Sequence, residues 1–210
     1  MARQTQPKKR TSKADATRRE LLDAALAIIT ERGYSAATVD QIVEAAGVSK
    51  GVAYYHFSSK ADIAQCLLVE GVDTLCSSFQ QVVGEMPTAT EALMAMVEVF
   101  ASFIFQNPAF GRFFVSELWR EGRAWTGSMR QHEERLLAVL REQLVRGQRE
   151  GTVRPEIDPA FEAVALVGMI LTTTLYYIGE EGQALPDSER TQRQFITHIA
   201  DFVHHANAPA

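Results

Sequence analysis

The sequence predicts an all-α fold of about nine helices, with a small N-terminal three-helix head on a larger helical body. Apolar residues recur at helical spacing from one end of the chain to the other. Prolines and glycines divide the chain into helix-sized segments, and no segment alternates apolar and polar residues as a half-buried strand does. A hydrophobic content of 46% with 22% charged residues is ordinary globular composition.

Capping residues indicate where the first helices begin and end within residues 14–60. An apolar stripe that starts at about Ala14 should stop at Gly33, because glycine adopts the left-handed conformation at little cost. Thr38 and Gln41 have the spacing of a capping box and should open a second, short helix.

The next signals complete a helix-turn-helix. Gly47 supplies a turn, and Ser49 can cap a third helix over about 50–55. Ser59 followed by Asp62 should open a long fourth helix that runs toward residue 80. Two short helices joined by a turn that contains glycine form a helix-turn-helix, whose second helix can enter the DNA major groove.

Apolar and polar positions separate on these helices. A small core is expected from Leu22, Leu26, Ile29, Ile42, Ala46, Val48, Ala53 and Phe57. The residues left for the surface are Ser49, Lys50, Gly51, Tyr54, Tyr55 and His56. Hydroxyls and an imidazole can donate to phosphate oxygens, and lysines release counterions. Core packing of the two tyrosines is the alternative.

Charge is distributed unevenly along the chain. Residues 1–60 carry ten Lys and Arg against six Asp and Glu, whereas the other 150 residues carry 11 against 20. A basic amino end on an acidic body indicates an anionic partner for the first sixty residues. Residues 1–13 form a basic arm, either reaching the DNA minor groove or serving as a solvating tail.

The stretch TVDQIVEAAGVSKGVAYYHFSSKADI resembles the helix-turn-helix of the TetR (tetracycline-repressor-like) family of bacterial transcription regulators, over roughly Arg18–Ile63. The run AGVSKG-x-x-Y-Y-H-F-x-S-K is specific to that family. Ala53 departs from the pattern, which usually has a larger aliphatic residue there. The resemblance implies DNA contacts, mostly to phosphates, by Thr38, Ser49, Lys50, Gly51, Tyr54, Tyr55, His56 and Lys60.

The body is expected to be helical throughout. Its helices should lie near 88–106, 108–121, 126–150, 158–179 and 188–205. We therefore expect three parts: a mobile arm over 1–13, a DNA-binding head over 14–60, and a ligand-binding and dimerisation domain over 61–206.

Two of these helices indicate a dimer. FEAVALVGMILTTTLYYI is apolar nearly all round, which requires burial on every side, and a second copy of the chain would cover one face. The last helix places Phe195, Ile199 and Phe202 on one stripe. The resemblance implies a homodimer through these two helices. Two heads about 34 Å apart would then bind a pseudo-palindromic double-stranded DNA operator.

Aromatic residues are frequent in the middle of the chain, including Trp119 and Trp125. They are either core or the wall of an effector pocket, which would be mostly apolar with a few polar groups. Candidates for the lining are Phe100, Phe103, Phe114, Glu117, Met169, Thr173 and Tyr176. These walls suit a small, largely apolar effector of an acyl or aromatic kind, whose binding would release a repressor from its operator.

Several other functions find little support. No pattern places a nucleophile beside a base, and no glycine-rich loop for phosphate is present, so we expect neither an enzyme nor a cofactor. His198, Asp201 and His205 give only a partial metal site, although a metal-responsive regulator and a transcriptional activator remain alternatives. We expect a cytoplasmic protein without a membrane partner, and reduced thiols at Cys66 and Cys76.

Overall fold

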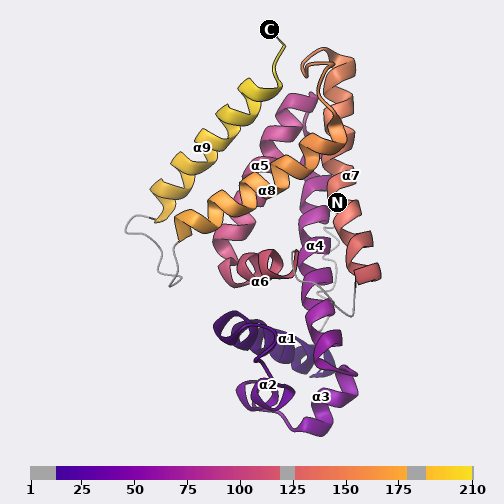
Figure 1. Ribbon diagram of the computed structural model, residues 1–210, viewed down its shortest axis with the longest axis vertical. Coiled ribbons are helices and arrows are strands. Elements are labelled where there is room, and N and C mark those ends of the chain that lie inside the picture. The colour runs from indigo at the N-terminus through magenta and orange to yellow at the C-terminus, as the bar shows by residue number, and fades with distance from the viewer. Residues whose placement is uncertain (1–12, 119–125, 179–187, 210) are drawn as a thin grey trace, which may run out of the picture. The chain divides into compact units, whose positions relative to one another are not determined.

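The computed structural model describes residues 13–118, 126–178 and 188–209, and this part of the chain contains helices and no strand. The all-α prediction is confirmed. The helices are α1 Lys13–Arg32, α2 Val39–Ala45, α3 Lys50–His56, α4 Lys60–Glu85, α5 Ala89–Gln106, α6 Pro108–Leu118, α7 Thr126–Glu150, α8 Pro159–Ile178 and α9 Ser188–Asn207 (Figure 1). They form two compact units, Met1–Cys66 and Leu67–Ala210, so the division falls inside α4.

The first unit packs α1, α2 and α3 against one another. Its core contains the predicted Leu22, Ile29, Ile42, Ala53 and Phe57, all of them buried. The other predicted core residues, Leu26, Ala46 and Val48, are half-buried. Leu21, Ala25, Ala37 and Val43 complete this core.

Glycine ends the first two helices of the first unit, as predicted. Gly33 has φ +77° and donates its N–H to Ile29 O at 2.8 Å, which closes α1. Gly47, with φ +66°, donates to Glu44 O, and Val48 donates to Val43 O. These two bonds form a Schellman motif, which satisfies the last carbonyls of α2 and turns the chain toward α3.

The second unit is built around α5, which contacts α6, α7, α8 and α9. Figure 1 shows α8 crossing α5, and α9 contacts both of these helices. The large buried side chains include Phe79, Met96, Phe100, Ile104, Phe113 and Leu136. Phe79 and Phe100 meet edge to face with ring centroids 6.2 Å apart. Aromatic packing therefore supplies much of this core.

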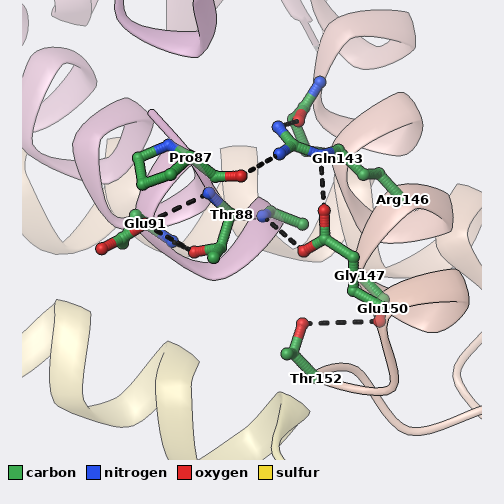
Figure 2. Close-up of polar contacts among 9 residues, drawn as sticks. Pro87, Thr88, Glu91, Gln143, Arg146, Gly147, Glu150 and Thr152 are labelled. Carbon is green, nitrogen blue, oxygen red and sulfur yellow. Dashed lines mark hydrogen bonds and ion pairs between the residues drawn. The ribbon is translucent and has the colours of Figure 1, made fainter. Parts of the chain in front are cut away.

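A polar cluster fixes the start of α5 to the end of α7 (Figure 2). Thr88 and Glu91 form a capping box, and the Ala89 N–H donates to Glu150 Oε2 at 2.8 Å. Arg146 donates to Glu150 Oε1 at 2.7 Å and also to the Pro87 carbonyl. The bond from the Ala89 amide, followed by the Arg146 guanidinium, lowers the pKa of Glu150.

Candidate nucleic-acid interface

The outer face of α3 presents the residues that the sequence assigns to DNA. Tyr54 is 51% exposed and Tyr55 is 81% exposed. Ser49, Lys50 and Gly51 are also exposed, and His56 is half-buried. The alternative that Tyr54 and Tyr55 are core aromatics is therefore wrong.

The positions of residues around α3 explain why the two tyrosines are exposed. Ala53 and Phe57 lie four residues apart and both point into the core, so the two tyrosines between them point away from it. The Arg18 guanidinium lies 5.3 Å from the Phe57 ring centroid, a cation–π contact that holds α1 over the end of α3. Ala53, the departure from the family pattern, is buried, with only 2% of its surface exposed.

Two hydroxyl residues cap the short helices from the exposed side. Thr38 Oγ1 accepts the Gln41 N–H at 3.2 Å, and Gln41 Oε1 accepts the Thr38 N–H at 3.0 Å, as the predicted capping box requires. Ser49 Oγ accepts the Val52 N–H at 3.3 Å. Each hydroxyl uses a lone pair for the cap, so its O–H donor stays available for a phosphate oxygen.

Lys50 forms an ion pair that sequence reasoning did not include. Its Nζ lies 2.7 Å from Asp40 Oδ1 in the first turn of α2. The hydrogen bond to Asp40, together with the charge of that carboxylate, raises the pKa of Lys50. The lysine is thus protonated, but a DNA phosphate has to compete with Asp40 for it.

Lys60 points at the backbone of its own unit. Its Nζ donates to Tyr34 O and Ala37 O, both at 2.7 Å, and to Ser35 O at 3.3 Å. It also lies 4.4 Å from the Tyr34 ring centroid. The phosphate contact implied for Lys60 by the resemblance stays a prediction.

The candidate effector residues do not share one environment in the second unit. Phe100, Phe114 and Glu117 are buried, whereas Phe103, Met169 and Thr173 are half-buried. Phe110, which the sequence did not single out for the lining, joins Phe103 at 5.5 Å and Phe114 at 5.8 Å between ring centroids. Tyr176 is 81% exposed and points away from this cluster.

Other predicted features are absent or fall outside the described residues. Within residues 13–118, 126–178 and 188–209, no three His, Cys, Asp or Glu side chains come together as a metal site. Asp201 and His205 meet only through the Asp201 carbonyl, 2.7 Å from His205 Nδ1. Residues 1–12 of the predicted arm over 1–13, together with Trp119 and Trp125, lie outside the described part of the chain, and Lys13 is the first residue of α1.

Family models match both units. Residues 21–66 match the model of bacterial regulatory proteins of the tetR family, and residues 90–203 match the tetracyclin repressor-like C-terminal domain. This chain belongs to the TetR family. It is accordingly a DNA-binding transcriptional regulator with a helix-turn-helix head, in a family made up of regulators and not of enzymes.

The relatives include a shorter match of higher identity and a longer match of lower identity. The transcriptional activator FasR of Mycolicibacterium smegmatis is 42% identical over 90 residues, which are 43% of this chain and 41% of FasR. The regulator SrpR of Pseudomonas putida is 27% identical over 172 residues, which cover 82% of this chain and 79% of SrpR. The chain therefore spans less than half of FasR but most of SrpR.

A solved structure shares the fold of both units. The regulator FadR from Bacillus subtilis, in complex with stearoyl-CoA, superposes with a TM-score of 0.74 at 21% identity, over 87% of this chain and 97% of FadR.

Among the described residues, two helices of the TetR-family chain, α5 and α8, are long and apolar enough to cross a membrane. Core helices of soluble proteins have the same composition, so this is weak evidence for a membrane segment.

Proposed function

We propose that this TetR-family chain is a cytoplasmic, homodimeric repressor, released from a pseudo-palindromic operator by a small, largely apolar effector. The observation that carries the proposal is the exposure of Tyr54, Tyr55 and Lys50 on α3, together with the exposed capping residues Thr38 of α2 and Ser49 of α3. Hydroxyls and lysine suit phosphate, and the tyrosine rings suit sugars and thymine methyl groups.

The dimer is supported by the outward faces of α8 and α9. The exposed apolar side chains there are Phe161, Val164, Tyr176, Tyr177 and Phe202. On α8 they flank the small residues Ala165, Gly168 and Thr172, which are also exposed. A second copy of this surface would bury the apolar face, as the all-round apolarity of α8 requires.

The predicted stripe on α9 needs one correction. Phe195 and Ile199 are buried against their own chain, and Val203 continues that buried stripe. Phe202 is 63% exposed, so it belongs to the outer face of α9 instead. Phe202 is thus the α9 residue we place in the dimer interface.

The packed aromatic side chains of the second unit support an apolar effector. The rings of Phe103, Phe110 and Phe114 pack together, and Glu117, one turn beyond Phe113, is buried at 1% exposure. Aromatic walls with one buried carboxylate suit an acyl or aromatic molecule that carries a polar group. FadR, a neighbour in fold, is in complex with an acyl-CoA, which agrees with this class.

Selection of duplexes from a random DNA pool tests the DNA part. Wild-type protein at moderate salt should enrich a pseudo-palindrome whose half-sites lie about 10 base pairs apart or a multiple of that spacing. Tyr55→Ala should reduce the enrichment strongly, whereas Tyr55→Phe, which loses only the hydroxyl, should reduce it less. Equal enrichment by wild type and Tyr55→Ala would show that the α3 face does not contact the operator.

Titration of the selected complex with stearoyl-CoA tests the effector class. A coupling free energy of about 1–3 kcal/mol would weaken operator binding roughly 5- to 150-fold. Coenzyme A without the acyl chain is the control and should leave binding unchanged. If saturating stearoyl-CoA leaves the affinity for the operator unchanged, this long-chain effector is excluded.

Activation is a second candidate, since the relative FasR is named an activator. A reporter gene placed behind the selected operator distinguishes the two modes. Deletion of the regulator raises expression if the protein represses and lowers it if the protein activates.

A further inference from the structure

An exposed ion pair joins the two short helices of the first unit. Lys50 is the first residue of α3, and its Nζ lies 2.7 Å from Oδ1 of Asp40 in the first turn of α2. The side chains of Lys50 and Asp40 are 55% and 69% exposed, respectively. Both charges are therefore open to a large anionic partner, although they have opposite signs.

Helix dipoles account for the position of Asp40 but not for that of Lys50. A carboxylate in the first turn of a helix is favourable, whereas a cation there is unfavourable, and Lys50 holds that position in α3. The contact with Asp40 offsets this unfavourable position. Asp40 also follows Thr38 by two residues, so a negative charge lies close in sequence to a residue that the family resemblance assigns to phosphate.

The sizes of two electrostatic effects decide how Asp40 influences DNA binding. If the Lys50 ammonium donated to Asp40 and to a DNA phosphate together, its tetrahedral geometry would hold the two anions about 4–5 Å apart. Repulsion between unit charges at that distance is about as large in bulk water as the best exposed ion pair, and about four times larger near a protein surface. Sharing the ammonium is therefore less favourable than exchanging one anion for the other.

We propose that Asp40 is an affinity-determining residue, an intramolecular competitor that phosphate has to displace from Lys50 when the head binds DNA. Lys50 keeps its contact with phosphate, and Asp40 lowers the net contribution of that contact. Because phosphate carries no sequence information, the reduction applies to any duplex and limits binding to DNA outside the operator. The inference rests on the proposed binding of DNA through α3.

The affinity for a mixed-sequence duplex of about 30 base pairs tests this competition, measured by fluorescence anisotropy over a range of salt concentrations. Breaking an exposed ion pair costs at most a factor of about five, so Asp40→Asn should tighten binding by up to roughly five-fold for each head bound. The slope of log affinity against log salt should become steeper by about 0.9 at most per head, since phosphate then displaces counterions instead of the Asp40 carboxylate.

A double-mutant cycle separates the ion pair from the charge of Asp40 itself. In a Lys50→Met background, Asp40→Asn should change the affinity no more than Asp23→Asn changes it in wild type, where Asp23 is an exposed aspartate of α1. An equal gain in both backgrounds would show that the carboxylate acts without Lys50 and would overturn the proposal. A loss of affinity in Asp40→Asn would also overturn it, because Asp40 would then position Lys50 for phosphate.

Lysine labelling tests the ion pair without DNA. Reductive methylation needs a free amine, and mass spectrometry reads each lysine separately. The hydrogen bond to Asp40 raises the pKa of Lys50, so Lys50 should react up to about five-fold faster in Asp40→Asn than in wild type, whereas Lys13 should react at the same rate in both. An unchanged rate at Lys50 overturns the proposal even if the protein binds DNA. A faster rate at Lys50, combined with a wild-type protein that binds no duplex, would refute the proposed function and the competition together.

Discussion

A leucine at position 168 should separate the two protomers of the proposed dimer without destabilising either one. Gly168 lies in the exposed face of α8 between Ala165 and Thr172, and a Cβ built there meets nothing within 4 Å of its own chain. Leucine is also a better helix former than glycine, by about 0.8 kcal/mol. Within one protomer, Gly168→Leu should therefore be tolerated or slightly stabilising.

The expected cost arises only in the dimer. Phe161, Tyr176 and Phe202 together expose roughly 400 Å² on one protomer, about half of the 800 Å² that a standard interface buries on each partner. A leucine forced between two such faces costs about 1–3 kcal/mol. Both protomers carry the change, so the total cost is about 2–6 kcal/mol and the dissociation constant should rise between about thirty-fold and twenty-thousand-fold.

Sedimentation velocity over a range of protein concentrations measures this shift. Gly84→Leu is the matched control, because Gly84 lies in α4 and also has nothing within 4 Å of a Cβ. It should dimerise like wild type, and both variants should keep the helical circular dichroism of the wild-type protein. A Gly168→Leu protein that dimerises as tightly as Gly84→Leu would refute the placement of the interface on α8.

Three further substitutions test the packing and the head. Gly147→Ala should lower the free energy of unfolding by about 1–3 kcal/mol in denaturant titration, because a Cβ would lie 2.5 Å from Val153 Cγ2; Gly84→Ala should not lower it. The lowered pKa of Glu150 means that its stabilisation is present above its ordinary pKa of 4.5 and is lost as the pH falls through the folded value. The melting temperature of Glu150→Gln should therefore fall less than that of wild type on acidification below that pH. Thr38→Asp should keep the cap and the melting temperature but weaken DNA binding, measured by fluorescence anisotropy, because a carboxylate repels phosphate.

Local signals predicted the helix ends of the head closely. The residues at these ends are capping hydroxyls and glycines, whose chemistry by itself favours the start or the end of a helix. Thr38 and Ser49 cap as expected, and Gly33 and Gly47 adopt positive φ. The end of α4 was less predictable: the helix runs to Glu85, beyond the expected residue 80. No glycine or proline marks a stop at residue 80, and the Pro87 region ends the helix instead.

The orientation of side chains in the second unit could not be predicted in the same way. An apolar residue on an all-round apolar helix gives no sign of the direction it faces. Tyr176 was expected beside Phe100, yet one is exposed and the other is buried. Phe202 and Val203 are adjacent and both apolar, and only the packing of α9 on α5 decides which one is buried. Such choices depend on tertiary contacts, which periodicity does not contain.

Donor capacity distinguishes two polar residues of the head, Thr38 and Lys60. A hydroxyl has one donor and two lone pairs, so Thr38 can accept the Gln41 N–H and still donate to phosphate. An ammonium has donors alone, and those of Lys60 have three carbonyls as acceptors. In the sequence, Thr38 and Lys60 look alike, since each is a polar residue at a helix start. The sequence alone therefore does not show that the Thr38 hydroxyl keeps its donor available for another partner, whereas the Lys60 ammonium already donates to carbonyls of its own chain.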